Sequence, residues 1–501
     1  MTKHLRPLTL ALRCLALATV ASCSLLLAQD ADPEEAFGTG LVFDVEAYRS
    51  VPYKAPVTAE TYADLPKSVS LEKYCPTPGD QGPHSTCTGF AAAYHLRTIL
   101  YAIENQMTNR RQIDDAIFSP TFVYEKIRDP EGDPNCKKGT SPVAALELMR
   151  SVGVAPLDAV PYLCGAGIDS DDLLIATEFP IVDYQILYTT NLPENDPIKV
   201  LSVKKALSEG SPVLICFKVH KSFYRASEVW RQQATDAGPE GQHGLHAMVA
   251  VGYDDNRYGG AVRVINSWGT KEWGDRGFVW IPYDDFARNC IGALQAYGKQ
   301  PKPKPYQKSV PVTPETPLLL AGSVEFEERD GTEMPAIKIV KDGVNASGQH
   351  FEGYRLARAY PSGTRFRFYV NTNSRAYLYA FATDLTGKIT QILPFEDGMS
   401  PMIGKGSTIA FPSEKKVVRM DNVPGTDYLL MLYSDEPLDP KALAEAIEAN
   451  EGTLSVKVHQ ALGPRLIQQE HIKYADDGIG FAIQQQTRGH VVPLMVEIVH
   501  D

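Results

Sequence analysis

The chain has 501 residues, of which 44% are hydrophobic and 22% charged, so it carries enough apolar surface to form folded cores. Its 49 Lys and Arg against 61 Asp and Glu give a net charge of −12, which excludes a nucleic-acid binder that relies on a basic face. At roughly 150 residues per domain, the length predicts two or three domains. No segment beyond the N-terminus has the roughly 18 apolar residues of a membrane span, so no transmembrane span is predicted.

The N-terminus has the form of a secretory signal peptide. Basic residues precede an uncharged apolar run over residues 14–28, and acidic residues follow at once. We predict a signal peptide at residues 1–28, cleavage after Ala28, and an exported protein that is periplasmic, on the cell surface or extracellular. Lipoprotein processing at Cys23 and an uncleaved N-terminal anchor helix are the alternatives.

Four further regions follow from composition and periodicity. Residues 29–64 are acidic with little periodicity and predict an extended lead-in. Residues 65–298 are globular, with helical patterns first and short strands later, which is typical of an α+β domain with two unlike halves. Residues 299–317 form a linker rich in proline and lysine. Residues 318–501 are predicted as a separate, β-rich accessory domain.

Helix signals lie in the first half of the α+β domain. Apolar residues at helical spacing predict a helix over residues 87–104. Ser119 and Ser141 each stand directly before a proline, which predicts two helix starts, and Gly153 ends the second of these helices. The strands predicted in the second half are 212–219, 246–253, 261–267 and 277–281.

The accessory domain is predicted as a mostly antiparallel, β-sandwich-like fold. One amphipathic helix is expected at 439–450, and Leu385-Thr386-Gly387 suits a hairpin connection. Nothing in its sequence indicates a binding partner. The predicted strands are 364–370, 376–382, 388–394, 416–420, 427–434 and 453–459.

Cys87 is the first candidate for a catalytic residue. It follows Gln81 by six positions and begins the helix predicted over 87–104. A helix N-terminus stabilises a thiolate, so the pKa of this thiol is expected below its ordinary value. A buried structural thiol is the alternative for a cysteine considered alone.

Two later motifs favour a catalytic role for Cys87 over a structural one. Leu245-His246-Ala247 opens an apolar run, and Asn266-Ser267-Trp268-Gly269 follows it, with Trp273-Gly274 and Gly277-Phe278 beyond. Together with Gln81 and Cys87, these motifs resemble papain-like cysteine peptidases over about residues 65–298. The resemblance implies a two-lobed fold, a helical lobe followed by a β-barrel-like lobe, and hydrolysis of peptide bonds in peptide or protein substrates.

The resemblance also implies a role for each motif residue. Cys87 would attack the scissile carbonyl as a thiolate, and His246 would pair with it and protonate the leaving amine. Asn266 would orient the imidazole, with Trp268 shielding their hydrogen bond from water. Gln81 would form the oxyanion hole together with the Cys87 backbone N–H.

Substrate-binding residues are implied less directly. Gly139 and Thr140 stand where the family has a glycine-rich substrate-binding strand, of which one glycine remains. Leu245 replaces an acidic residue that often precedes the histidine, and with Trp268 it would line a neighbouring pocket. The lead-in is also too short for the family's long inhibitory prosegment.

A disulfide is a further expectation. His84 occupies a position where the family usually has a disulfide cysteine, so Cys136 needs another partner. Cys75, shortly before the nucleophile loop, is the partner predicted for Cys136. An exported protein of this size permits one or two such bridges.

No cofactor and no metal are predicted. His243 and His246 have the spacing of metal ligands, but no carboxylate or cysteine joins them. Residues 376–395 resemble an uncharacterised bacterial module without assigned activity. The alternative to a peptidase is a papain-like fold that is weakly active or inactive and acts as a peptide-binding or surface-interaction protein.

Overall fold

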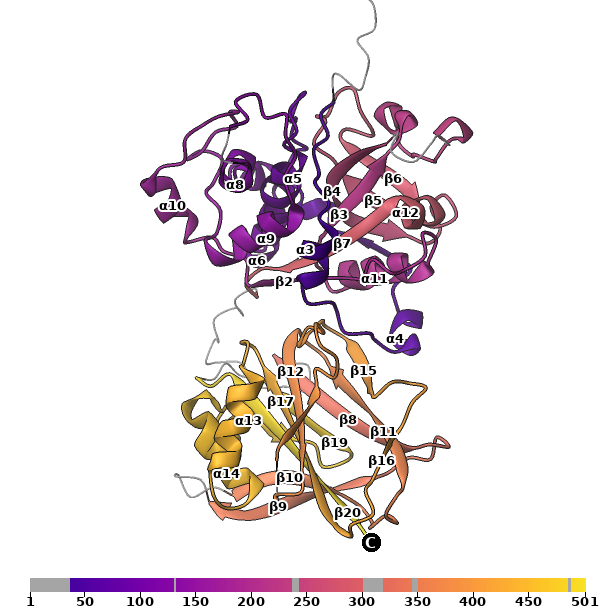
Figure 1. The fold of residues 1–501 in the computed structure, drawn as a ribbon, viewed down its shortest axis with the longest axis vertical. Helices are drawn as coiled ribbons and strands as arrows, with labels where there is room; N and C mark the ends of the chain where they lie inside the picture. The colour runs from indigo at the N-terminus through magenta and orange to yellow at the C-terminus, as the bar shows by residue number, and fades with distance from the viewer. Residues whose placement is uncertain are drawn as a thin grey trace, which may run out of the picture.

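The computed structural model describes residues 37–129, 132–236, 243–300, 319–344, 350–386, 388–484 and 488–501. The predicted signal peptide, most of the linker and Gly387 of the predicted hairpin lie outside these ranges. Two domains lie one above the other in Figure 1, the first coloured indigo to pink and the second orange to yellow. No helix within the described ranges is long and apolar enough to cross a membrane.

The first domain begins with a helical lobe that confirms the predicted helices. A continuous helical stretch runs from Cys87 to Glu104, and the Ser119 and Ser141 side chains accept the cap hydrogen bonds from Phe122 and Ala144. The elements of this lobe are η1 (Glu72–Tyr74), α5 (Cys87–Gly89), the π-helix η2 (Phe90–Arg97), α6 (Thr98–Glu104), α7 (Arg110–Asp114), α8 (Pro120–Ile127), α9 (Pro142–Ser151) and α10 (Ser170–Ala176).

The second lobe is built on an antiparallel sheet with the order β2-β7-β3-β4-β5-β6, to which β1 adds by pairing with β4. The four strands predicted from sequence are β3 to β6. The strands of this lobe are β1 (Ser68–Ser70), β2 (Asp183–Ile186), β3 (Val213–Val219), β4 (Gly244–Asp254), β5 (Ala261–Ile265), β6 (Phe278–Pro282) and β7 (Cys290–Tyr297), and its helices are α11 (Pro197–Ser208), η3 (Lys221–Arg225), η4 (Ala234–Asp236) and α12 (Tyr283–Asn289).

The accessory domain has two sheets that pack face to face, as the sandwich prediction requires (Figure 1). One sheet has the order β13-β12-β17-β20-β10-β9 with β14 added, and the other the order β15-β11-β8-β19-β18 with β16 added. Its strands are β8 (Leu320–Glu328), β9 (Ala336–Val344), β10 (His350–Leu356), β11 (Arg365–Thr372), β12 (Ala376–Thr383), β13 (Thr390–Leu393), β14 (Met402–Ile403), β15 (Ser407–Phe411), β16 (Val418–Arg419), β17 (Gly425–Ser434), β18 (Lys473–Tyr474), β19 (Ile479–Ile483) and β20 (Val491–His500).

Two helices cover one face of this domain. The predicted helix is α13 (Pro440–Ala449), but the strand predicted at 453–459 is wrong, because this segment is helix α14 (Leu454–Leu462). Leu454, Val458 and Leu462 recur every four residues and all are buried, which is helical rather than strand periodicity. The short helices η5 (Gly463–Arg465) and η6 (Gln469–His471) follow.

The lead-in is not simply extended. It carries two short helices, α3 (Val45–Ser50) and α4 (Ala59–Ala63), and Figure 1 places α4 at the boundary between the two domains. The Tyr48 side chain is fully buried in the first domain, where its hydroxyl donates to the Tyr188 carbonyl at 2.9 Å. This tyrosine anchors the lead-in in the core of the first domain.

The same segment then contacts the accessory domain. Tyr53 N–H donates to Gly398 O at 2.7 Å, and Thr58 N–H donates to Thr408 O at 2.9 Å. Ala55 is buried in the core of the accessory domain. The lead-in therefore connects both domains by backbone hydrogen bonds as well as by side-chain packing.

Buried charges also lie at the domain boundary. The Glu209 carboxylate accepts from Lys54 Nζ at 2.7 Å and lies 3.0 Å from Lys205 Nζ. Lys205 Nζ in turn donates to the Lys405 carbonyl of the accessory domain at 2.7 Å. The two lysines hold the pKa of Glu209 below its usual value although burial opposes this.

Candidate active site

The predicted nucleophile lies at the start of the helical stretch 87–104, where α5 packs against β4. Cys87 is fully buried. Strand β4 carries His246 close to its first residue, Gly244. The helix that begins with Cys87 thus packs on the strand that carries His246.

The predicted base is joined to the predicted orienting residue. His246 Nε2 and Asn266 Oδ1 are 2.7 Å apart, and both side chains are fully buried. Among the described residues, His246 Nδ1 has no hydrogen-bond partner. The hydrogen bond fixes the imidazole plane and leaves Nδ1 available to a neighbouring group.

An aromatic cluster covers this pair. The Trp268 ring lies 4.7 Å from the His246 ring and stacks on Tyr224 at 5.1 Å. Only 2% of Trp268 is exposed. Excluding water from the His246–Asn266 hydrogen bond strengthens it, because the local dielectric constant falls.

Gln81 is held by both lobes. Its Oε1 accepts from Ser267 Oγ at 2.6 Å, its backbone N–H donates to Ser267 O at 2.9 Å, and its Nε2 donates to His84 O at 2.7 Å. These contacts place the amide nitrogen on the side of the His84–Cys87 loop. Nε2 carries a second N–H, which can donate a hydrogen bond to an oxygen of a ligand.

Residues 37–42 of the lead-in lie across this site. The Phe37 ring stacks on Trp268 at 5.1 Å, and Trp268 Nε1 donates to Gly38 O at 3.0 Å. Gly38 N–H donates to Gly82 O at 3.0 Å. This covering segment explains why Cys87 and His246 have no exposed surface.

Like Trp268, the other three predicted substrate-binding residues contact the same segment. Gly40 and Leu41 N–H both donate to Leu245 O, at 3.3 and 3.1 Å. Thr140 N–H donates to Gly40 O at 2.9 Å, and a Cβ built on Gly139 would overlap that same oxygen. The retained glycine therefore permits close backbone approach of an extended chain.

Burial sets the protonation of the site. It raises the pKa of Cys87 to about 12, although the Ala247 N–H acts in the opposite direction. It lowers the pKa of His246 to about 4. In this covered form, thiol and imidazole are both neutral near pH 7, contrary to the low thiol pKa expected from the helix N-terminus.

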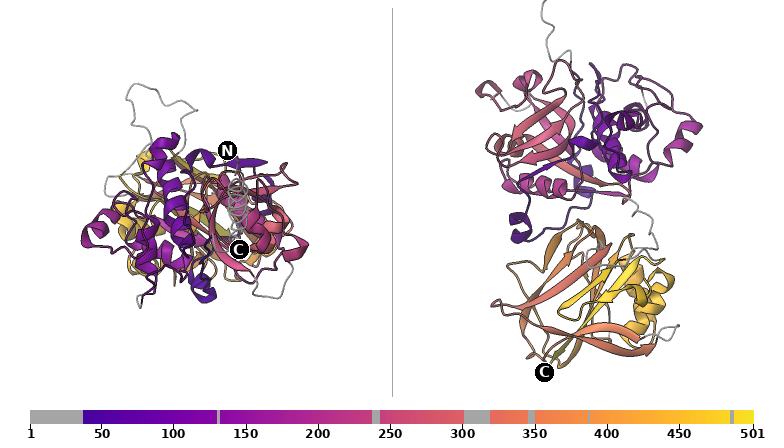
Figure 2. Two further views of the ribbon diagram at one scale, coloured as in Figure 1. Left: turned by 90° about the horizontal axis from the view of Figure 1, so that it is seen from above. Right: turned by 180° about the vertical axis from the view of Figure 1, so that it is seen from behind.

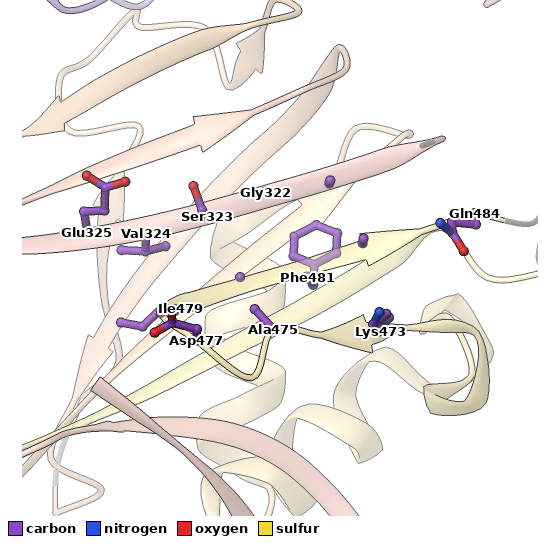
Figure 3. Close-up of a pocket in the computed structure, with 14 residues that line it drawn as sticks. Gly322, Ser323, Val324, Glu325, Lys473, Ala475, Asp477, Ile479, Phe481 and Gln484 are labelled. Atoms are coloured by element: carbon purple, nitrogen blue, oxygen red, sulfur yellow. The ribbon is translucent and has the colours of Figure 1, made fainter. Parts of the chain in front are cut away.

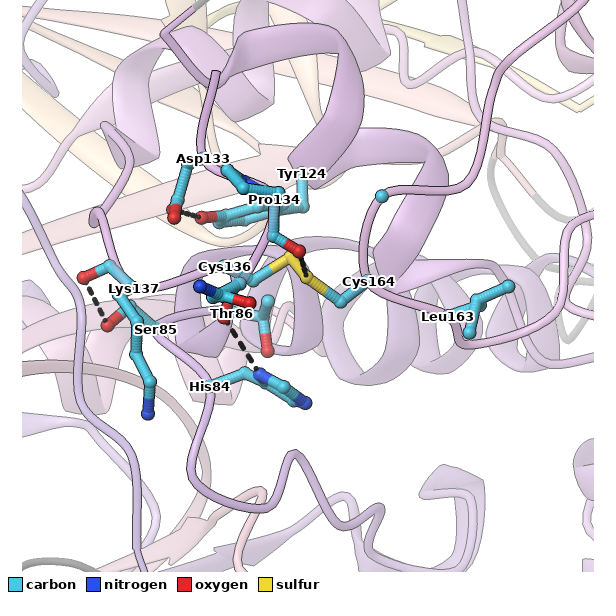
Figure 4. Close-up of a disulfide and its surroundings, with 12 residues drawn as sticks. His84, Ser85, Thr86, Tyr124, Asp133, Pro134, Cys136, Lys137, Leu163 and Cys164 are labelled. Atoms are coloured by element: carbon cyan, nitrogen blue, oxygen red, sulfur yellow. Dashed lines mark hydrogen bonds between the residues drawn. A yellow bond between two sulfur atoms is a disulfide. The ribbon is translucent and has the colours of Figure 1, made fainter.

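The predicted Cys75–Cys136 disulfide is wrong. Cys136 is bridged to Cys164, with Cα atoms 5.9 Å apart, whereas Cys75 is an unbridged, fully buried core residue whose Sγ lies 3.6 Å from Leu71 O. Cys164 stands in the loop between α9 and α10, which passes beside Cys136 (Figure 4).

The bridge lies next to the nucleophile loop, as Figure 4 shows. Ser85 N–H donates to Cys136 O at 2.7 Å, and Ser85 Oγ donates to Lys137 O at 2.9 Å. Sequence reasoning missed Cys164 and the covering residues 37–42. The two glycines at 38 and 40, between aromatic residues, were the available signal for the covering segment.

A separate hollow lies in the accessory domain, between β8, β19 and the turn before β19 (Figure 3). It has a volume of about 530 Å³, and its charged lining residues are Glu325, Lys473 and Asp477. It is distinct from the site around Cys87. Across the described ranges, no group of three or more His, Cys, Asp or Glu side chains is arranged to hold a metal.

Comparison with known structures gives similar chains at low identity. Xylellain, a cysteine protease from Xylella fastidiosa, is 21% identical over 55% of this chain and 100% of its own, with a TM-score of 0.41. A procathepsin B from Trypanosoma congolense is 18% identical over 54% and 87%, with a TM-score of 0.39. A digestive procathepsin L from the larval midgut of Tenebrio molitor is 17% identical over 56% and 89%, with a TM-score of 0.38.

Comparison with protein families identifies two regions of the chain. No curated protein matches the chain. Residues 359–437 match a domain of unknown function, DUF4384. Residues 80–297 match the papain family of cysteine proteases, and this stretch contains the Gln81, Cys87, His246 and Asn266 motifs. Residues 80–297 are therefore a papain-family cysteine peptidase domain.

Proposed function

We propose that the protein is an exported peptidase that hydrolyses peptide bonds through Cys87, His246 and Asn266, with Gln81 in the oxyanion hole. The observation that carries the proposal is the 2.7 Å His246–Asn266 hydrogen bond, which leaves Nδ1 for a thiol that begins a helix. A signal-peptide-like N-terminus supports export.

Catalysis follows from these positions. With the site open to solvent, His246 Nδ1 takes the Cys87 proton, and the thiolate attacks the scissile carbonyl carbon. The carbonyl oxygen becomes negative and accepts from Gln81 Nε2 and the Cys87 backbone N–H. The His246 imidazolium then protonates the amine as the C–N bond breaks, leaving a thioester on Cys87.

Deacylation reverses the proton path. His246 takes a proton from water, whose oxygen attacks the thioester carbonyl, and the C–S bond breaks to release the acid and Cys87. Asn266 holds the imidazole in one plane through both steps. The side-chain amide contributes orientation rather than a proton.

A peptide as the substrate is supported by the covering segment. Residues 38–41 lie in the site through backbone hydrogen bonds to Gly82, Thr140 and Leu245. Backbone hydrogen bonds of this kind can bind an extended peptide largely independently of its side chains. The same contacts also favour the second candidate, a peptide-binding protein with little or no turnover.

Turnover of fluorogenic peptides under reducing conditions distinguishes the two. The full chain should cleave them once the covering segment is displaced, and Cys87→Ala should abolish cleavage. Cys75→Ala is the matched control, because Cys75 is an equally buried, unbridged thiol elsewhere in the domain. Undiminished cleavage by Cys87→Ala, or none by the parent in any state, contradicts the proposal.

A further inference from the structure

Tyr162 lies two residues before the bridged Cys164 and contacts the loop that contains Gln81 and Cys87. Its hydroxyl donates to Gln81 O at 2.8 Å and lies 3.0 Å from Thr86 Oγ1. Because the single phenol hydrogen goes to the carbonyl, Thr86 is the donor in the second bond. Burial raises the pKa of Tyr162, which keeps the hydroxyl protonated for this donation.

These two bonds tie the loop near both of its ends. Gln81 is the proposed oxyanion donor, and Thr86 immediately precedes Cys87, whose backbone N–H is the other donor. The Tyr162 ring also packs edge-on against Phe90, with centroids 4.8 Å apart. The tyrosine is therefore fixed against the same helix that begins with Cys87.

The backbone around Tyr162 is itself held in place. Cys164 is bridged to Cys136, whose carbonyl accepts from Ser85 N–H at 2.7 Å. Leu163 N–H donates to Thr121 Oγ1 at 3.0 Å, and Gly165 N–H donates to the Glu125 carboxylate at 2.8 Å. The disulfide and helix α8 thus hold the backbone on the C-terminal side of Tyr162.

Gln81 is consequently fixed from two directions. Ser267 of the strand-rich lobe holds its amide oxygen and its backbone N–H, while Tyr162 of the helical lobe holds its carbonyl. A residue whose backbone N–H and C=O are both hydrogen-bonded has little freedom to change its φ and ψ angles. The position of Nε2 relative to the Cys87 N–H depends on that restriction.

We propose that Tyr162 is a positioning residue for the oxyanion hole, which acts by holding Gln81 and Thr86 so that the two donors converge on one oxygen. The inference rests on the proposed peptidase function. The Tyr162 hydroxyl supplies a non-covalent connection between the two parts of this loop. Small displacements of positioned groups lower rates strongly in enzymes.

Tyr162→Phe tests the tie, because it removes the hydroxyl and keeps the ring against Phe90. We expect kcat for a fluorogenic peptide to fall about tenfold while KM changes less than about twofold, since the oxyanion forms only in the transition state. Tyr184→Phe is the matched control, because it removes one hydroxyl, which is bonded to Glu147 of α9 at 3.1 Å. Its kcat should equal that of the parent.

The double variant Tyr162→Phe/Gln81→Ala distinguishes a positioning role from a general loss of structure. If Tyr162 acts through Gln81, Tyr162→Phe should lower kcat much less in the Gln81→Ala background than in the parent. Alkylation of Cys87 by iodoacetamide needs no oxyanion hole and should proceed at the parental rate in Tyr162→Phe. Fully additive losses, or a parallel loss of alkylation, overturn the proposal.

Thr86→Val provides a second variant if Tyr162→Phe fails to fold, because it removes the other bond to the same hydroxyl. It should lower kcat in the same sense and leave KM unchanged. If the parent cleaves peptides and the variants have the same kcat as the parent, the positioning role alone is overturned. A parent without turnover overturns the proposed function, and the positioning role with it.

Discussion

His246 Nε2 and Asn266 Oδ1 are 2.7 Å apart although the residues are 20 positions apart in the chain. The same Oδ1 also accepts from the Ser267 backbone N–H at 2.7 Å. An oxygen that already accepts one backbone hydrogen bond presents its remaining lone pair to the imidazole. His246 therefore carries its proton on Nε2, and its Nδ1 is the basic nitrogen.

Asn266→Ala should lower kcat by about tenfold to a hundredfold, because it frees the imidazole without removing the base. His246→Ala should have the larger effect. The pH profile of kcat/KM should retain its basic limb in Asn266→Ala and lose it in His246→Ala. Equal rates in parent and Asn266→Ala would remove asparagine from the proposed mechanism.

The covering segment can be displaced by one substitution. A side chain at Gly40 would overlap Ser85, and Gly40 has a φ of +147° that other residues rarely adopt. Gly40→Val should raise the rate at which iodoacetamide alkylates Cys87 by at least about tenfold, because the site opens to water. Gly167→Val is the control, since a Cβ there meets no atom within 4 Å.

Acid should destabilise the folded protein. Burial lowers the pKa of His246 from 6.5 to about 4 and that of His95 to about 3, so the folded chain binds fewer protons than the unfolded chain. Its stability is complete above about pH 6.5 and declines as the pH falls toward 4. Thermal unfolding midpoints should follow this decline.

A variant isolates the contribution of one histidine. His246→Asn cannot take up a proton, so its unfolding midpoint should fall less steeply between about pH 6.5 and 4 than that of the parent. Identical slopes would show that other groups control the acid response.

Removing the Cys136–Cys164 bridge should lower the free energy of unfolding by about 2–4 kcal/mol, because the bridge closes a loop between residues 28 positions apart. Urea unfolding of Cys136→Ala/Cys164→Ala measures the loss. Reductant should lower the stability of the parent and leave that of the double variant unchanged. A reductant effect in both would place the sensitive group elsewhere.

The motif residues could be proposed from the sequence because each motif is short and local in the chain. Gln81 and Cys87 share one loop, and His246 and Asn266 each belong to a short motif beside a buried strand. The disulfide partner could not be predicted in this way. Cys164 has no neighbouring pattern, and cysteine connectivity depends on which loops meet in space.

Two other errors have physical causes. The helix N-terminus at Cys87 favours a thiolate, but the covering segment removes water, and desolvation outweighs the helix in raising the pKa to about 12. In the accessory domain, the predicted strand at 453–459 is helix α14, because Leu454, Val458 and Leu462 are buried at helical spacing.

The anchor at Tyr48 has a consequence for any proteolytic maturation of this chain. A single cut between Val42 and Tyr48 would release the residues that cover Cys87 while residues from Tyr48 onward stay bound to both domains. The new N-terminus would belong to a segment that Thr58 fastens to the accessory domain. Opening the site would thus leave the two domains joined as before, so one chain can change its accessibility to peptides without changing its architecture.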